Sequence, residues 1–310
     1  MFTEVKVKNI INKHKNNSLF KEYTVNPYYG CIFDCVYCYV RGSKYGQGEE
    51  KGLRAKINAI EILEKELQTL SKKNDVVSLP FYPPIFSSYK ETIIISSSTD
   101  PYLPLEKELK LTRRMLETIK KYNFPVEIIT KSDLVLRDID LLKEFYSSMK
   151  SGFNSRANFF PLKVSISIST LDEKLSSLLE PNAPPPTKRL EVVKILKDEG
   201  ILSGIYLMPV IPFITDSEKQ IELVIKTAKD YGAEYVIPSS LSLYETFDGN
   251  RNSCKFIFYK FLETHFPSLI SKYDNLYNTG SFTNKEYHEN LYKKIKKISQ
   301  KYRIKNTSFL

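Results

Sequence analysis

Hydrophobic residues along the chain alternate between short continuous runs and longer stretches with helical spacing. The short runs predict buried strands over residues 92–96, 126–130, 162–169, 201–209 and 234–237. Between and after them, apolar residues recur every three or four positions, which predicts helices over residues 105–122, 137–146, 187–199 and 217–231. Gly200 and Gly232 directly follow two of these helices, as is common at helix C-termini.

Strands separated by helices of this length predict parallel pairing through right-handed crossovers. A further strand near residues 23–25 and a helix over residues 55–71 bring the prediction to six strands. This order of elements is compatible with a partial (β/α)6 barrel and with a doubly wound open sheet, and the pattern alone does not separate the two. The fold class is α/β in both cases.

The two ends of the chain differ from this alternating region. Residues 1–22 are polar and basic, which predicts an extended lead-in to a core over residues 23–240. Residues 241–310 are rich in Tyr and Lys and predict a helical C-terminal extension. Its last helix, near residues 285–302, places Leu291, Ile295 and Ile298 on one apolar stripe with lysines over the rest of its surface.

The amino-acid composition indicates in which cellular compartment the protein works and which class of partner it favours. The chain of 310 residues has 42% hydrophobic residues, an N-terminus without the apolar run of a signal peptide, and no apolar stretch of the ~18 residues that a membrane span needs. Its four cysteines suit a reducing compartment better than a disulfide framework. We therefore expect a soluble, cytoplasmic protein. The net charge of +10 favours a polyanionic partner such as DNA or RNA, or reflects a Lys-rich background composition.

Three of the four cysteines, Cys31, Cys35 and Cys38, lie within one short segment. Such spacing lets one tight loop direct three thiolates at a single metal centre. A structural zinc site needs a fourth protein ligand, and the remaining Cys and His residues are isolated in the sequence. A [4Fe-4S] cluster held by three cysteines leaves one iron open for a substrate or cofactor.

The spacing of these cysteines, with Tyr37 just before the third, resembles the signature of the radical S-adenosylmethionine (SAM) superfamily. The runs Asn26-Pro27-Tyr28-Tyr29-Gly30-Cys31 and Thr99-Asp100-Pro101-Tyr102 resemble the spore photoproduct lyase-like branch, which is related to DNA repair photolyases. The resemblance covers roughly residues 20–240. It implies a partial (β/α)6 TIM-like barrel, a [4Fe-4S] cluster on Cys31, Cys35 and Cys38, and SAM bound to the open iron.

The resemblance also implies the chemistry. A reduced cluster passes one electron to the SAM sulfonium, the C5′–S bond breaks, and the 5′-deoxyadenosyl radical abstracts hydrogen from a substrate. The protein's share is binding, orientation and exclusion of water. Reduction requires an external donor of the ferredoxin or flavodoxin type.

In parallel α/β barrels, catalytic groups lie where the strands end. The second strand ends in hydroxyls and a carboxylate, and Ser97, Thr99 and Asp100 are predicted to accept the methionine ammonium of SAM; a turn that caps the next helix is the alternative for Asp100. The third strand ends at Lys131, which is a candidate partner for the SAM carboxylate or an ordinary solvated lysine.

Further candidates follow the fourth strand. Ser165, Ser167 and Ser169 share one face of it by strand period, which predicts a polar lumen, and Ser167 and Ser169 are candidates for the SAM ribose. Glu180 is a candidate contact to SAM or substrate, or a surface carboxylate. Tyr37 is predicted to pack on the adenine.

One position departs from the photoproduct lyases. The hydrogen-donor cysteine of those enzymes lies three residues before the Asp of the second strand exit, where this chain has Ser97. Cys254 lies far along the chain and is expected to be a small buried hydrophobe away from the loop. Identical repair chemistry is therefore not predicted.

Three hypotheses remain from the sequence. The chain is a radical SAM enzyme, lyase-like, acting on a nucleic acid; a radical SAM enzyme acting on a small molecule or protein; or a non-enzymatic module with structural zinc. Iron and sulfide in anaerobically purified protein exclude the third hypothesis. A steep salt dependence of nucleic-acid binding favours the first hypothesis over the second.

Overall fold

The computed structural model describes residues 2–13, 22–43, 52–74, 92–150, 161–245 and 252–306. Of the predicted lead-in, residue 1 and residues 14–21 therefore lie outside the described residues. Within the described ranges, no helix is both long and apolar enough to cross a membrane.

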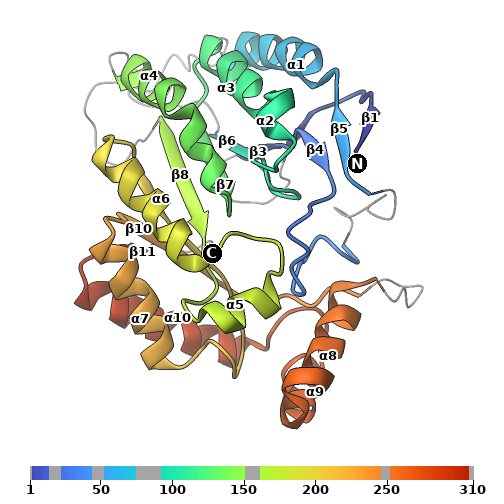
Figure 1. The fold of residues 1–310 in the computed structure, drawn as a ribbon, viewed down its shortest axis with the longest axis vertical. Coiled ribbons are helices and arrows are strands. Elements are labelled where there is room, and N and C mark those ends of the chain that lie inside the picture. Colours follow the sequence, from blue (N-terminus) through green and yellow to red (C-terminus); the bar gives the residue numbers. More distant parts are fainter. Residues whose placement is uncertain are drawn as a thin grey trace, which may run out of the picture.

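The centre of the molecule is a sheet in which neighbouring strands follow the order of the chain (Figure 1). Six strands of the predicted barrel pair in parallel in it: β3 (Glu22–Val25), β6 (Thr92–Ile95), β7 (Val126–Thr130), β8 (Leu162–Ser167), β9 (Ser203–Val210) and β10 (Tyr235–Ser240). A doubly wound sheet reverses its strand order partway across, and this sheet does not. Right-handed crossovers then place all connecting helices on one face, as in a barrel. The fold is therefore the predicted partial barrel.

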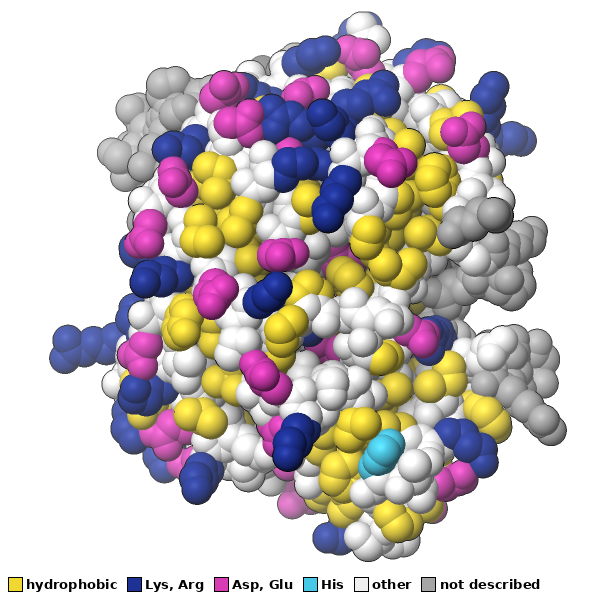
Figure 2. Space-filling model, viewed as in Figure 1, with side chains coloured by type: hydrophobic (Ala, Val, Ile, Leu, Met, Phe, Trp, Pro, Cys, Tyr) yellow, Lys and Arg dark blue, Asp and Glu magenta, His cyan; other side chains and the backbone are white. Residues whose placement is uncertain are grey.

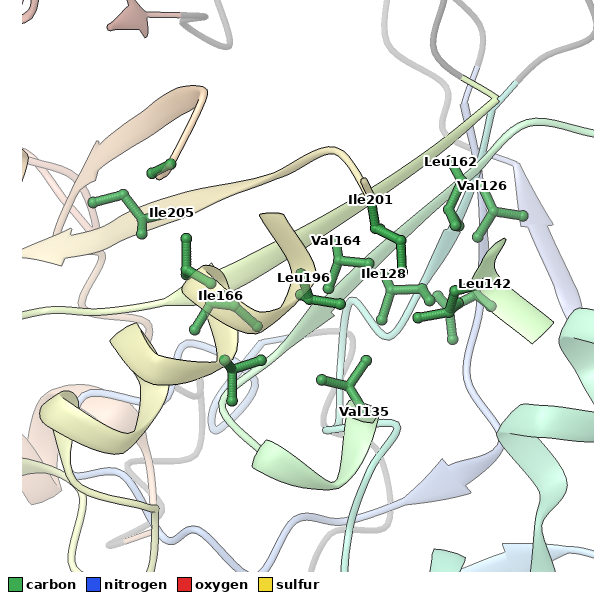
Figure 3. Close-up of a cluster of buried hydrophobic side chains, with 14 of the residues drawn as sticks. Val126, Ile128, Val135, Leu142, Leu162, Val164, Ile166, Leu196, Ile201 and Ile205 are labelled. Atoms are coloured by element: carbon green, nitrogen blue, oxygen red, sulfur yellow. The ribbon is translucent and has the colours of Figure 1, made fainter. Parts of the chain in front are cut away.

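Helices cover the outer face of this sheet. They are α1 (Ala59–Asn74), α3 (Leu111–Lys121), α4 (Ile139–Lys150), α6 (Pro186–Asp198) and α7 (Glu218–Asp230). The core between the two layers contains Ile128, Val164 and Ile166 from the strands and Leu142 and Leu196 from the helices, all buried (Figure 3). Val164 and Ile166, which alternate with the serines of the fourth strand, therefore face the helices.

One predicted helix, residues 105–122, is in fact two. Helix α2 (Glu106–Leu109) ends at Lys110, whose φ of 49° is left-handed, and α3 begins at the next residue. The buried Glu106 carboxylate accepts hydrogen bonds from the backbone N–H groups of Thr112 and Arg113. A carboxylate in this position satisfies the free donors at a helix start, which favours the break.

Several short elements carry no periodic signal in the sequence. Strand β2 (Ile11–Lys13) adds antiparallel to β3, and β11 (Lys305–Asn306) adds parallel to β10, giving eight strands in the described sheet. Strands β1 (Thr3–Val5), β5 (Arg54–Lys56) and β4 (Tyr28–Tyr29) form a separate small sheet. The strand predicted over residues 201–209 begins and ends slightly later, and a 3-10 helix (Asp133–Asp138) precedes α4.

The C-terminal extension is helical, as predicted. It contains α8 (Cys254–His265), a short 3-10 turn (Pro267–Leu269), α9 (Ile270–Leu276) and α10 (Lys285–Lys301). Leu291, Ile295 and Ile298 of α10 are buried in the core beside α7. Helices α8 and α9 lie at one end of the molecule, below the loop that follows β4 (Figure 1).

Candidate active site

The segment that carries Cys31, Cys35 and Cys38, residues 30–42, is called the cysteine loop below. It leaves β4 through Gly30, whose φ of 76° is left-handed, and a Cβ there would lie 3.1 Å from the carbonyl oxygen of Gly52. Two turns follow, because the N–H of Cys38 donates to the carbonyl of Cys35 (3.1 Å) and the N–H of Arg41 to that of Cys38 (3.2 Å). The loop is therefore tightly folded on itself.

The three cysteine side chains share one apolar environment. Burial raises the pKa of the Cys35 thiol to about 12, and raises the pKa of the Cys31 thiol as well. The Cys38 charge raises the pKa of both further, so the three thiols lie near one another. Three thiolates at one buried place are unfavourable without a cation, and a bound metal centre supplies one.

The donor set fits an iron–sulfur cluster. Within the described ranges, no three Cys, His, Asp or Glu side chains form a group arranged to hold a metal ion. In a [4Fe-4S] cluster each cysteine binds a different iron, so its thiolates need not converge on one point. Three thiols from one loop match the ligand set that leaves one iron open.

Cys254 lies beside this loop, so the expectation that it is remote is wrong. Its side chain is buried, as expected, and burial followed by the neighbouring Cys38 charge raises its thiol pKa to about 12. Its backbone N–H donates to the carbonyl of Arg41 (3.2 Å). A Cβ at Gly42 would lie 3.1 Å from the Cβ of Ser253, so glycine permits this close approach. The start of α8 is thus attached to the end of the cysteine loop.

The exit of β6 is tied to the cysteine loop and to Asn26, which precedes it. The Asn26 carboxamide oxygen accepts from the N–H of Ser98 (3.0 Å), and its nitrogen lies 3.5 Å from the Ser97 hydroxyl. The Thr99 hydroxyl donates to the carbonyl of Gly30, and the Tyr39 hydroxyl donates to the carbonyl of Ser97. Ser97 and Thr99 therefore lie against the cysteine loop, as the strand-exit prediction requires.

Asp100 joins the exits of β6 and β7. Its buried carboxylate accepts hydrogen bonds from the N–H of Tyr102 (2.9 Å), the hydroxyl of Thr130 (2.7 Å) and the N–H of Lys131 (2.8 Å). Burial raises the pKa of Asp100 and these three bonds lower it. Its charge also raises the pKa of Cys31, so it lies close to the cysteine loop. Three donors already engage the carboxylate, which gives it a structural role whether or not it also contacts SAM.

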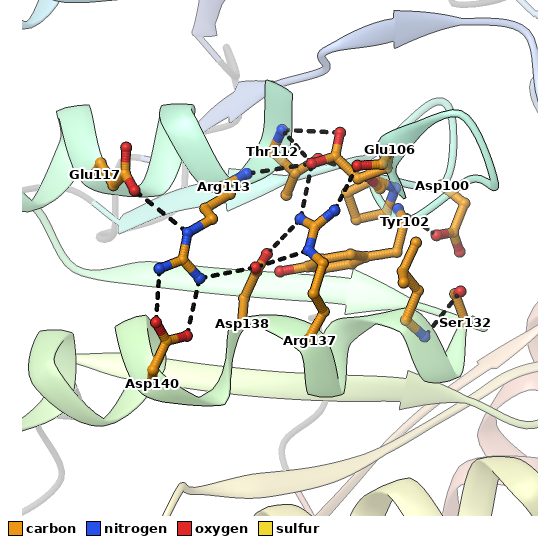
Figure 4. A network of polar contacts seen from close by, with 12 residues as sticks. Asp100, Tyr102, Glu106, Thr112, Arg113, Glu117, Ser132, Arg137, Asp138 and Asp140 are labelled. Atoms are coloured by element: carbon orange, nitrogen blue, oxygen red, sulfur yellow. Dashed lines mark hydrogen bonds and ion pairs between the residues drawn. The ribbon is translucent and has the colours of Figure 1, made fainter. Parts of the chain in front are cut away.

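Behind this exit lies a buried charged network (Figure 4). The carboxylates of Glu106 and Asp138 are fully buried and both pair with Arg137, at 3.0 and 2.7 Å. Arg113 joins Asp138 at 3.1 Å, and the Tyr28 hydroxyl donates to Glu106. The network holds β4, and therefore the start of the cysteine loop, against α2.

Lys131 places a cation beside the thiols. Its Nζ lies 5.7 Å from the centre of the Tyr37 ring, and its charge lowers the pKa of Cys35. It is half-buried at the exit of β7, where the sequence predicted a partner for the SAM carboxylate. That contact remains a prediction.

Tyr37 connects the cysteine loop to the exit of β8. Its hydroxyl donates to the carboxylate of Glu180, which also accepts from the Ser169 hydroxyl (3.0 Å) and pairs with Arg189. Glu180 and Arg189 are each 1% exposed, so Glu180 is not a surface carboxylate. Arg189 also donates to the carbonyl of Ser167 (3.0 Å). Ser167, Ser169 and Tyr37 are thus brought together by an ion pair.

Nothing in the sequence indicated that Glu180 and Arg189, which flank a Pro-rich segment, form an ion pair. The sequence analysis also did not predict a polar cluster on the concave face of the barrel. In this cluster the Glu127 carboxylate accepts hydrogen bonds from the hydroxyls of Ser165 and Tyr206 (2.8 Å each) and forms an ion pair with Lys163 (2.7 Å). The polar lumen predicted from the serine stripe therefore exists, but Ser165 is engaged inside the protein.

Comparisons with known proteins agree with this geometry. A family model described as the Radical SAM superfamily matches residues 25–225. An uncharacterized protein of Methanocaldococcus jannaschii is 32% identical over 217 residues, which cover 69% of this chain and 70% of that protein. An uncharacterized protein of Mycobacterium tuberculosis is 27% identical over 310 residues, which cover 98% of this chain and 81% of that protein.

Solved structures share the fold at low sequence identity. Spore photoproduct lyase with bound AdoMet and dinucleoside spore photoproduct has a TM-score of 0.64 at 12% identity, covering 99% of this chain and 80% of that chain. SuiB of Streptococcus suis bound to S-adenosylmethionine has a TM-score of 0.53 at 11% identity, covering 92% of this chain and 49% of that chain. At these identities the likeness establishes the fold alone.

Proposed function

Because the chain belongs to the radical SAM superfamily, we propose that Cys31, Cys35 and Cys38 hold its [4Fe-4S] cluster and that it abstracts hydrogen from a substrate. When bound, the cluster supplies the electron that cleaves the C5′–S bond of SAM. The observation that carries the proposal is the position of the cysteine loop: hydrogen bonds tie it to the exit of β6 and to Glu180 beyond the exit of β8, and the Lys131 cation lies beside it at the exit of β7.

The chain's own residues supply binding and shielding. Lys131 is suited to the carboxylate of SAM, the hydroxyls of Ser97 and Thr99 to its ammonium, Ser167 and Ser169 to its ribose, and Tyr37 to its adenine. One apolar cluster contains the three cysteines together with Phe258 of α8 and Tyr273 of α9. The C-terminal helices therefore cover the loop from one side and keep water from it.

Lys131→Met is expected to weaken SAM binding about tenfold or more, since a hydrogen bond to a charged group contributes about 1.5–3 kcal/mol. The measurement is equilibrium binding of SAM to cluster-loaded protein under anaerobic conditions. Lys219→Met, on the exposed surface of α7, is the matched control and should bind as the parent does. Unchanged affinity in Lys131→Met would remove Lys131 from the SAM site.

Testing whether Asp100 contacts SAM requires a near-isosteric substitution. Asp100→Ala leaves the donors of Tyr102, Thr130 and Lys131 buried without an acceptor, so a loss of SAM binding would not separate direct contact from collapse. Asp100→Asn keeps the shape and one acceptor oxygen. Weaker SAM binding in Asp100→Asn, with unchanged cluster content, would support a direct contact.

For the substrate we propose a nucleic acid, supported by the net charge of +10. Helix α10 offers fewer free positive charges for phosphate binding than its sequence suggests, because Lys297 and Lys301 form ion pairs with Glu218 and Glu222 of α7. Lys293 and Lys296 are exposed, and neither forms an ion pair within the described ranges. A small molecule or protein substrate is the alternative.

Charge reversal at Lys293 and Lys296 is expected to flatten the salt dependence of DNA or RNA binding, by up to about one unit of slope for each phosphate that is no longer neutralised. The measurement is affinity against salt concentration for the parent and for Lys293→Glu/Lys296→Glu, with SAM cleavage as the control. No binding by the parent at low salt would favour a small molecule or protein substrate.

A further inference from the structure

A groove of about 340 Å³ runs along one side of the cysteine loop. One wall is the loop itself, through Ile32 and Phe33, which directly follow Cys31. The other walls are the approach to α2, the start of the 3-10 helix before α4, and the segment before α6. None of the residues proposed to bind SAM lines the groove, so it lies outside that site.

The wall beside the thiols is fixed in place. The Asn182 side chain donates to the carbonyl of Ile32 (2.9 Å), and its backbone N–H donates to that of Phe33 (3.4 Å). Pro104 and Pro184 form part of the lining, and proline restricts the backbone. Ile32 is 37% exposed and is one of the few large apolar residues that the described part of the chain leaves exposed.

The rim of the groove is basic. Lys107 and Lys188 line it, both are exposed, and neither makes an ion pair within the part of the chain that the structure describes. Asp133 is the carboxylate among the lining residues. On the face shown in the space-filling view, hydrophobic side chains extend across the middle, and Lys, Arg, Asp and Glu side chains are interspersed around them (Figure 2). An apolar centre with a cationic rim is complementary to an acidic protein surface.

We propose that this groove is the docking surface for an acidic one-electron carrier protein that reduces the cluster. The inference rests on the proposed function, since it needs a cluster on the cysteine loop. The carrier loses one electron and the cluster gains it, with no bond made or broken. A carrier on this groove contacts the residues next to Cys31 and leaves the strand exits free for SAM and substrate.

The test compares two reductants on the same cluster-loaded protein. Lys107→Glu/Lys188→Glu is assayed anaerobically for SAM cleavage driven by a reduced acidic flavodoxin and, separately, by excess dithionite. At low salt we expect the flavodoxin-driven rate to fall about tenfold or more, because charge complementarity accelerates encounter. The dithionite-driven rate should stay at the parent's value. Lys107→Gln/Lys188→Gln should show a smaller loss.

A matched control reverses two exposed lysines of α7, Lys219→Glu/Lys229→Glu, and should keep both rates. In the parent, the flavodoxin-driven rate should also fall as salt rises, and this dependence should flatten in the groove variant. A parental flavodoxin-driven rate in the groove variant, or an equal loss with both reductants, would overturn the docking surface. No dithionite-driven cleavage by the parent would instead overturn the proposed function.

Discussion

Cys35→Ala is expected to lose the iron–sulfur cluster. After anaerobic reconstitution the parent should contain about four irons and four sulfides per chain, and the variant close to none. The reason is the proposed ligand set: three thiols on one loop would hold a cluster that has one iron without a protein ligand, so removing one thiol would leave two. Cys31→Ala and Cys38→Ala should behave alike. Iron and sulfide analysis with the visible absorption spectrum is the measurement.

Cys254→Ala is the decisive control, because the Cys254 thiol lies close enough to Cys38 for each charge to affect the other. The variant should keep the full iron content and the same SAM-dependent change in spectrum. If it loses iron as Cys35→Ala does, Cys254 is a fourth ligand and no iron is open to SAM. Zinc in place of iron in the anaerobically purified parent would contradict the assignment altogether.

Arg189→Met should lower the free energy of unfolding by about 3–5 kcal/mol, the usual cost of breaking a buried ion pair by removing one partner. Glu180 would keep its hydrogen bonds with Tyr37 and Ser169 but lose its cation. Urea unfolding of the cluster-free protein measures the change. A loss below about 1 kcal/mol would mean that the pair is not buried as described.

The pH dependence of this variant has a definite sign. Burial raises the pKa of Glu180 and Arg189 lowers it, so removing Arg189 should raise that pKa further. A carboxyl group whose pKa is raised on folding contributes stability at low pH that is lost as the pH rises through the folded-state value. The stability of Arg189→Met, relative to the parent, should therefore fall as the pH rises through the folded-state pKa that Glu180 has in the parent, which burial already holds above the ordinary Glu value.

The double variant Glu180→Gln/Arg189→Met is the matched control. It removes both charges and keeps a side chain of similar size that hydrogen-bonds to Tyr37 and Ser169. Much of the missing stability should return, because no unpaired charge remains buried. If the double variant is as unstable as Arg189→Met, the destabilisation comes from packing around Arg189 and not from the charge of Glu180.

The strands and helices of the barrel could be predicted because each carries its own local pattern. The alternation of Val164, Ser165, Ile166 and Ser167 reports the two faces of β8, and Val164 and Ile166 are indeed in the core while Ser165 is on the concave face. The sequential strand order could not be read from that pattern. It depends on which strands pair, and pairing is a contact between distant segments.

For the candidate site, the cysteine spacing and the strand-exit rule indicated that Thr99, Asp100 and Lys131 lie near the loop, and they do so in the structure. Their roles toward SAM stay predictions. The contacts of Cys254 and the Glu180–Arg189 pair were not predictable, because each joins segments that only the tertiary fold brings together. The resemblance to the radical SAM superfamily predicted the cofactors, but it did not predict that α8 and α9 cover the cysteine loop.

The most direct test of the proposed function is the formation of 5′-deoxyadenosine. Cluster-loaded protein, incubated anaerobically with dithionite and SAM, should release 5′-deoxyadenosine and methionine even without a substrate, and Cys35→Ala should release neither. Chromatography with mass detection measures both products. An iron- and sulfide-loaded parent that binds SAM and yet yields no 5′-deoxyadenosine would contradict the assignment of this chain's chemistry.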